Sequence, residues 1–449
     1  MNLLNGFIAI ITTVFSLMGV LALMDPVEPA PPTDGKTGSL VAFLKPDTGA
    51  DPDPDPDPDP DPDPDPEPPS DNVASSLGQL GRQLFRDPNL SANRTQSCST
   101  CHDEERAFTD GRLDANGAIS DVSLGDNGFS LGDRNAPSIS YAHLTPVFSR
   151  GTRERFNSQQ SDYEGYLGGL FWDGRAPTTA DQAKGPPLNP IEMGLMDTFT
   201  LSQRIQENPS YIEAFTTFFG AEVFDNPDEV FDAMAESIAA YEEADVFSTF
   251  DSKYDKSLTG DYTYSPLSKA AAGRALFFSQ QFTNCATCHQ LRPNNRSGEL
   301  FTGFEYHNIG VPVNETVRAI NNSDPGFTDA GLAANPEVPD TEDQMGKYRV
   351  PTLRNVAVSG PYMHNGVFDE LDTVVKFYDK FFEGSNFPTN PETGAVWREP
   401  EHPQTVARTE LLDGRRLDQD DVDALVCFMR TLTDERYEPL LPDDGLNCE

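Results

Sequence analysis

The chain carries one five-residue pattern twice, as Cys98-Ser-Thr-Cys101-His102 and as Cys285-Ala-Thr-Cys288-His289. Two thiols at this spacing can form thioethers with the two vinyl groups of one haem, and the adjoining histidine is then placed to ligate the iron. Four cysteines could instead bind zinc, but tetrahedral zinc sites rarely have a histidine directly after the second cysteine in both halves. The repeat therefore predicts two covalently bound c-type haems and a redox function.

The similarity between the two halves extends to the residues around these motifs. Gly81-Arg-Gln-Leu-Phe85 precedes the first motif and Gly273-Arg-Ala-Leu-Phe277 precedes the second, while Phe108-Thr-Asp and Phe301-Thr-Gly follow them. Each copy predicts an amphipathic helix that leads into a haem-binding loop. Apolar residues at helical spacing predict two more helices, at residues 227–250 and 418–433. Strand signals are weak, so we expect a mainly α fold with two cytochrome c-like haem domains in tandem, at residues 72–260 and 261–449.

The N-terminal part of the chain has a different composition. Residues 3–24 form an uncharged apolar run that is long enough to span a bilayer, which predicts either a membrane anchor or a cleaved signal peptide within residues 1–24. Residues 25–71 are rich in proline and aspartate, with eight consecutive Asp-Pro pairs at 51–66. Such a sequence predicts an extended, semi-rigid linker without a core.

Covalent haem attachment and an apolar N-terminus both indicate export to an oxidising compartment, the periplasm. Cys427 and Cys448 remain after the four haem cysteines are assigned, and a disulfide between them fits such a compartment. The net charge of −41 argues against nucleic-acid binding. That charge serves solubility, or it attracts a basic electron-transfer partner.

Five further motifs follow one another in a fixed order around the second haem motif. They are Arg134-Asn-Ala-Pro-Ser138, Phe171-Trp-Asp-Gly-Arg175, Asn189-Pro-Ile-Glu-Met193, Val350-Pro-Thr-Leu-Arg-Asn-Val356 and Pro361-Tyr-Met-His-Asn-Gly366. Together with both haem motifs, this set resembles the bacterial di-haem cytochrome c peroxidase family, which includes MauG and MbnH-like enzymes. The resemblance covers residues 72–435. It implies an oxidoreductase whose N-terminal haem reacts with hydrogen peroxide and whose C-terminal haem transfers electrons.

The resemblance also implies roles for three residues between the haem motifs. Glu192 matches the distal glutamate, which can take a proton from peroxide and return it to the leaving oxygen. Gln182 matches the glutamine that orients peroxide, and Trp172 matches the tryptophan between the haems. Taken without the resemblance, a single glutamate is usually a solvated surface group and a tryptophan is usually part of a core.

Two further sites follow from the same resemblance. The family places a calcium ion between the haems, which implies ligation by the side chain of Asn135 and the backbone carbonyls of Ser359 and Pro361. The sixth ligand of the second haem is methionine in cytochrome c peroxidases, but the matching position here is Tyr378, as in MauG and MbnH-like members. A phenolate stabilises oxidised iron more than a thioether does, which favours storage of oxidising equivalents.

Several points stay open at this level. Met363 and Met345 lie near Tyr378 in sequence and are alternative ligands to the second iron. The distal side of the first haem is either open, as in MauG, or ligated by His143, because no histidine precedes the Arg134 motif at the position many peroxidases use. Residues 149–168 are expected to form a surface loop, which either has no function or shapes the access of a partner. His307 and His402 are expected to be structural or surface residues.

Three functions from different classes are compatible with this set of residues. The first is a MauG-like enzyme that uses peroxide to oxidise residues of a partner protein. The second is a peroxidase that reduces hydrogen peroxide with electrons from a small cytochrome c or a cupredoxin. The third is a di-haem electron carrier without catalysis, which the combination of Glu192, Gln182 and an open distal site disfavours.

Overall fold

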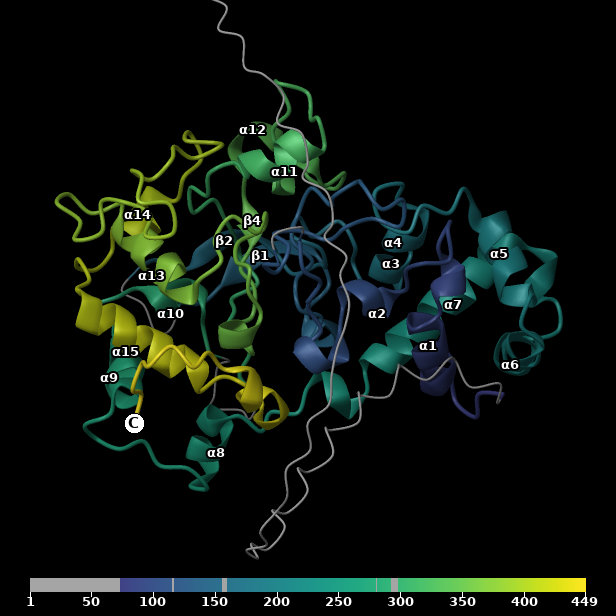
Figure 1. The fold of residues 1–449 in the computed structure, drawn as a ribbon, viewed down its shortest axis with the longest axis horizontal. Helices are drawn as coiled ribbons and strands as arrows, with labels where there is room; N and C mark the ends of the chain where they lie inside the picture. The colour runs from purple at the N-terminus through teal and green to yellow at the C-terminus, as the bar shows by residue number, and fades with distance from the viewer. Residues whose placement is uncertain (1–72, 115–116, 156–159, 280, 292–297) are drawn as a thin grey trace, which may run out of the picture. The chain divides into compact units, whose positions relative to one another are not determined.

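The computed structural model, drawn as a ribbon in Figure 1, describes residues 73–114, 117–155, 160–279, 281–291 and 298–449. The apolar run at residues 3–24 and the proline-rich segment at residues 25–71 lie outside the described residues, so the anchor or signal and the linker stay predictions. Within the described ranges, no helix combines the length and the apolar character that crossing a bilayer requires.

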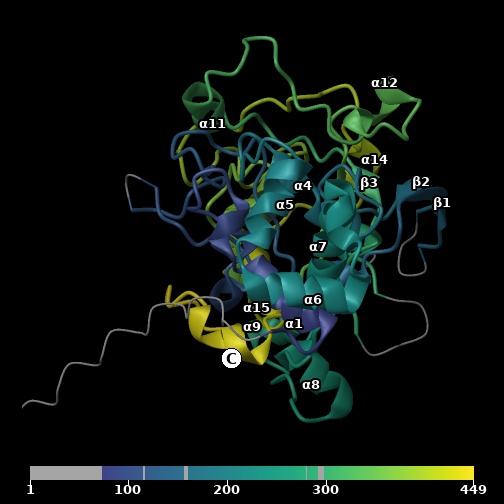
Figure 2. The same cartoon turned by 90° about the vertical axis from the view of Figure 1, so that its right-hand side faces the viewer.

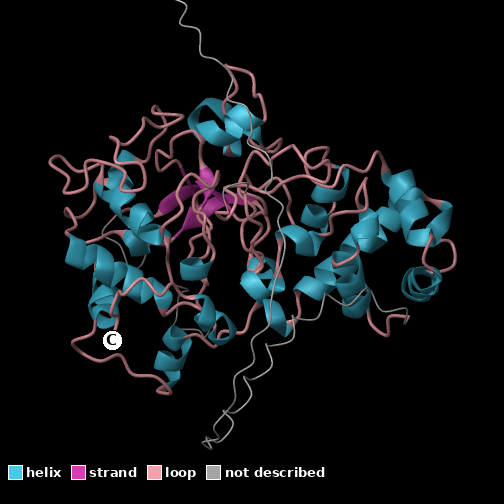
Figure 3. Ribbon diagram, viewed as in Figure 1, coloured by secondary structure: helices cyan, strands magenta, loops and turns pink. Residues whose placement is uncertain are grey.

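Helices dominate the described residues, and loops connect them (Figure 3). The longer helices are α1 (Leu77–Phe85), α5 (Thr198–Gln206), α6 (Pro209–Phe219), α7 (Pro227–Glu242), α8 (Lys253–Thr259), α9 (Lys269–Phe277), α11 (Glu315–Ile320), α13 (Leu371–Asp379) and α15 (Gln419–Arg430). The shorter ones are α2 (Cys98–Cys101), α3 (Thr179–Ala183), α4 (Gly185–Leu188), α10 (Cys285–Cys288), α12 (Thr341–Gln344) and α14 (Arg408–Leu411). The prediction of a mainly α fold is confirmed, and both haem motifs form single helical turns.

Two helix pairs repeat in the two halves of the chain. Helix α1 packs against α7, and helix α9 packs against α15, as Figures 1 and 2 show. The side chains of Ser76 and Ser268 cap α1 and α9 by accepting hydrogen bonds from backbone N–H groups of their first turns. The predicted helices at 227–250 and 418–433 are therefore present as α7 and α15, although each ends earlier than the apolar pattern suggests.

The apolar side chains gather in two principal clusters that correspond to these pairs. One contains buried residues of α1, α5, α6 and α7, and the other contains buried residues of α8, α9, α13 and α15. The disulfide between Cys427 and Cys448 ties the last helix of the second cluster to the C-terminal end, which confirms the predicted pair. Two clusters are compatible with two haem domains, but the boundary at 260/261 stays a prediction.

Both helix pairs cross at a glycine. A Cβ atom at Gly81 would lie 1.8 Å from the carbonyl oxygen of Ser237, and a Cβ atom at Gly273 would lie 1.8 Å from that of Ala424. Because real atoms cannot approach so closely, the backbones of each pair meet at a distance that only glycine allows. The glycine shared by the two repeated sequence segments therefore serves helix packing.

We expect Gly81→Ala and Gly273→Ala each to destabilise the protein by at least about 1–3 kcal/mol, because the helices must separate to admit the methyl group. The matched control is Gly326→Ala, since a Cβ atom there would meet nothing within 4 Å. Thermal unfolding followed by circular dichroism measures the effect. Equal midpoints for the Gly81 and Gly326 variants would contradict this account of the helix crossing.

Among the residues that the structure describes, four short strands lie between the helical regions (Figure 3). Strand β1 (Ser149–Arg153) pairs antiparallel with β2 (Tyr163–Leu167), and β3 (Tyr306–His307) pairs antiparallel with β4 (Tyr348–Arg349). The expectation of a surface loop at 149–168 is wrong for its two ends, which form a hairpin. A bridge between Leu167 and Glu305 joins this hairpin to the second half of the chain, so its position depends on contacts distant in sequence.

Candidate functional site

The first haem motif opens onto a cavity of about 450 Å³. Cys98, Cys101 and His102 line it, and so do the three residues that the resemblance singles out, Glu192, Gln182 and Trp172. Helix α2 carries the two thiols, α3 carries Gln182, and the loop after α4 carries Glu192. Residues separated by almost a hundred positions thus surround one space beside the motif histidine.

The motif histidines are held in the same way in both halves. The ring Nδ1 of His102 lies 3.1 Å from the carbonyl oxygen of Phe108, and that of His289 lies 3.0 Å from the carbonyl oxygen of Phe301. Because a carbonyl only accepts hydrogen bonds, each Nδ1 donates and each Nε2 keeps a free lone pair. Burial lowers the pKa of His102, and it lowers the pKa of His289 to about 4, so burial favours the neutral ring in both halves. The repeated phenylalanines therefore orient two iron ligands.

The second haem motif opens onto another cavity, of about 240 Å³. Cys285, Cys288 and His289 line it, and Tyr378 of helix α13 lines it as well. Of the two alternative ligands, Met363 lines this cavity and Met345 is not among its lining residues. Burial raises the pKa of the Tyr378 phenol, so the phenolate form needs a positive centre beside it. Two thiols, a histidine and a cavity beside them in each half make both sites fit a c-type haem.

The side chain of Glu192 is partly buried in the wall of the first cavity. Burial raises the pKa of its carboxyl, while the positive charge of Arg175 and a hydrogen bond with Asn189 oppose this rise. Arg175 itself forms an ion pair with Asp173 at 2.8 Å and stacks over the ring of Phe171. A carboxyl group with a raised pKa, close to the space beside the motif histidine, is suited to accept and return a proton.

His143 does not take part in the first cavity. It lies in the 3-10 turn η3 (Ala142–Leu144), and of this turn only Ala142 is among the residues that line the cavity. Its Nδ1 is buried without a hydrogen-bond partner among the described residues. Of the two possibilities left open by the sequence, the structure therefore favours an open distal side over ligation by His143.

Two residues line both cavities, Trp172 and Arg349. The indole Nε1 of Trp172 donates to the carbonyl oxygen of Asn135 at 2.9 Å, and the backbone N–H of Arg349 donates to the carbonyl oxygen of Trp172 at 2.9 Å. Trp172 is therefore held between the two haem sites by backbone groups on both sides. This is the location that the sequence resemblance implies for it.

The three residues matched to a calcium site surround a small cavity. Asn135, Ser359 and Pro361 line it together with Asp110, whose carboxylate adds a further potential oxygen ligand. The Nδ2 of Asn135 donates to the carbonyl oxygens of Asp121 at 3.1 Å and Pro361 at 3.3 Å. Turning this amide would replace its nitrogen by oxygen, and the resulting set of oxygen ligands fits Ca²⁺.

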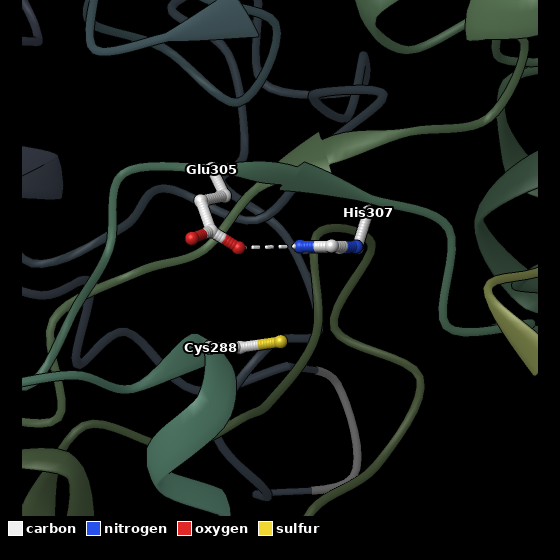
Figure 4. Close-up of side chains that lie close together, drawn as sticks. All are labelled: Cys288, Glu305 and His307. Carbon is white, nitrogen blue, oxygen red and sulfur yellow. Dashed lines mark hydrogen bonds and ion pairs between the residues drawn. The ribbon is translucent and has the colours of Figure 1, made fainter. Parts of the chain in front are cut away.

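The sequence did not single out a group of polar residues beside the second haem motif. Figure 4 shows Glu305 and His307 next to Cys288, with their potential ligand atoms and its sulfur within 4.8 Å of one another. The Nε2 of His307 lies 2.9 Å from Glu305, and Arg155 pairs with the same carboxylate at 3.1 Å. Because haem attachment consumes the Cys288 thiol, this group forms part of the haem surroundings. His307 lines the second cavity, which goes beyond the structural role expected for it.

Comparison with known proteins agrees with the geometry. A family model described as di-haem cytochrome c peroxidase matches residues 75–263. The methylamine utilization protein MauG of Paracoccus denitrificans is 46% identical over 377 residues, 84% of this chain and 92% of that protein. The cytochrome c peroxidase Ccp of Escherichia coli is 28% identical over 370 residues, 81% of this chain and 59% of that protein. The crystal structure of the diheme peroxidase BthA from Burkholderia thailandensis matches with a TM-score of 0.70 and 32% identity, covering 84% of this chain and 91% of that one.

Proposed function

The chain belongs to the di-haem cytochrome c peroxidase family, and on this premise we propose that it uses hydrogen peroxide to oxidise residues of a partner protein, as a MauG-like enzyme. A c-type haem in each cavity would supply a redox-active iron. His102 and His289 would ligate the two irons through Nε2, and the four motif thiols would hold the haems covalently. The observation that carries the proposal is the position of Tyr378 in the wall of the second cavity.

In this proposal, Glu192 and Gln182 of the first cavity have different roles. Glu192 would take a proton from hydrogen peroxide and return it to the oxygen that leaves as water. Gln182 orients peroxide through its amide. Burial raises the pKa of Glu192 toward the range in which a carboxyl can both accept and release a proton.

The second cavity determines which substrate can deliver electrons. Tyr378 would hold the iron of the second haem through its phenolate, which would lower the reduction potential relative to methionine ligation. A haem of low potential would accept electrons poorly from a small cytochrome c, which favours a partner protein as the electron source. Trp172, between the cavities, provides the aromatic route for these electrons.

A second candidate function is peroxide reduction with electrons from a small cytochrome c or a cupredoxin. One observation favours it: Met363 also lines the second cavity and could ligate the iron instead of Tyr378. The third function, electron transfer without catalysis, lacks support because Glu192 and Gln182 both face the space beside His102.

The proposal also includes a bound calcium ion and a periplasmic location. Calcium bound by Asn135, Ser359 and Pro361 would stiffen the region between the two haem sites, and the small cavity that these residues line together with Asp110 supports it. Haem attachment and the Cys427–Cys448 disulfide support a periplasmic location. Residues 3–24 would tether the protein to the inner membrane or direct its export.

Adding peroxide to the purified di-haem protein distinguishes the two enzymatic functions. Without an electron donor, we expect optical and Mössbauer changes at both haems that persist for minutes, and only slow turnover when reduced cytochrome c is added. Rapid turnover with reduced cytochrome c would instead support the ordinary peroxidase. Optical spectra that peroxide leaves unchanged at both haems would indicate an electron carrier.

A further inference from the structure

Arg349 carries a positive charge that no described residue neutralises. Its Nε is buried without a hydrogen-bond partner, and burial lowers the pKa of its guanidinium. Other enclosed arginines have carboxylate partners: Arg134 pairs with Asp173 and Asp329, Arg155 with Glu305, and Arg354 with Asp255. A buried guanidinium without an anion is unfavourable, so this side chain is expected to meet an anionic group that the polypeptide does not supply.

Backbone contacts with two different segments hold Arg349 in position. It pairs with Tyr306 across the β3–β4 sheet, and its N–H donates to the carbonyl oxygen of Trp172 at 2.9 Å. From this position its side chain lines the first cavity and the second one. Arg349 is thus a fixed cation in the wall that the two haem sites share.

The chemistry of haem identifies the missing anions. A c-type haem is attached through its vinyl groups and carries two propionate carboxylates on the opposite pyrroles. The planar guanidinium presents several N–H donors in a geometry that matches carboxylates. We propose that Arg349 binds a propionate of each haem and so bridges the two cofactors.

The bridge has a consequence for the redox properties of both haems. A cation beside the propionates stabilises the reduced, less positive form of each iron, so Arg349 raises both reduction potentials. Arg134 and Arg175 also line the first cavity, but Asp173 and Asp329 together balance their two charges. The inference goes beyond the proposed function, because it holds whether the electrons come from a partner protein or from a cytochrome.

Replacement of the guanidinium tests the bridge in the mature di-haem protein. Arg349→Met is expected to lower the midpoint potentials of both haems, whereas Arg349→Lys, which keeps the charge, should leave them near the wild-type values. Arg318→Gln is the matched control, because Arg318 is partly buried and paired with Glu401 but lines neither haem cavity. Intact mass verifies that each variant carries two haems.

The results distinguish a bridge between the two haems from other roles of Arg349. Potentials that fall at both haems in Arg349→Met alone support the proposal. Unchanged potentials, or a fall at only one haem, overturn it, and equal changes in the Met and Lys variants would mean a merely structural role. If Arg349→Met does not acquire its two haems, resonance Raman spectra of the wild type and of Arg349→Lys test the contact between Arg349 and the propionates instead. The propionate bending bands of both haems should shift between them, and unshifted bands would refute the contact.

Discussion

Glu192→Gln is expected to slow the reaction with hydrogen peroxide by about 10²–10⁴-fold while both haems stay bound, the usual effect of losing an acid–base group. The amide has nearly the shape of the carboxyl and still lines the first cavity, but it cannot take the proton that peroxide must lose. Rapid mixing of the ferric protein with peroxide measures the rate. Intact mass confirms the two covalent haems.

The pH dependence of this rate provides a second test. The reaction needs Glu192 as a carboxylate, and burial raises the pKa of that group above its ordinary value. The wild-type rate should therefore fall as the pH decreases through this raised pKa, because the protonated form cannot act as a base. The Gln variant should lack this dependence.

A second carboxyl group lines the first cavity and is an alternative candidate for the acid–base role. Glu242, at the end of helix α7, lines the same cavity, and burial raises its pKa to about 8. Glu242→Gln should retain most of the rate, and the exposed Glu243→Gln should retain all of it. A large loss of rate in Glu242→Gln together with a normal rate in Glu192→Gln would show that Glu242, and not Glu192, has the acid–base role.

Tyr378→Met is expected to raise the reduction potential of the second haem by on the order of 100 mV or more, within the ~0.8 V that axial ligands span. A neutral thioether stabilises ferrous iron better than an anionic phenolate does. The optical change that peroxide produces should then decay faster, and reduced cytochrome c should become a better donor. Spectroelectrochemical titration measures the potential of each haem separately.

Met363 supplies the control for this prediction, because it lines the same cavity. If Tyr378 is the ligand, the wild type lacks the near-infrared band of methionine-ligated ferric haem, and Met363→Leu changes neither potential. A wild-type protein that shows this band, and loses it in Met363→Leu, would have methionine as its ligand. The ordinary peroxidase function would then be the better assignment.

The haem attachment sites could be predicted from sequence because their chemistry is local. Two thiols and a histidine within five residues act on one haem wherever the chain folds, and the repeated Gly81 and Gly273 segments indicate the helices beside them. Glu192, Gln182 and Trp172 have no such local pattern. They were identified through the order of five motifs, and the structure places all three around the first cavity.

Other features depend on contacts that no sequence period encodes. The bridge from Leu167 of β2 to Glu305, the pairing of β3 with β4 and the place of His307 beside Cys288 bring together residues that are separated in the chain. Arg349 shows the reason most clearly, since nothing near it in sequence indicates a haem contact. By itself, the sequence determined two haems, a mainly α fold and the family. Only the tertiary structure decided which unpaired charge faces both cofactors, because burial and the distance between charges are set by packing.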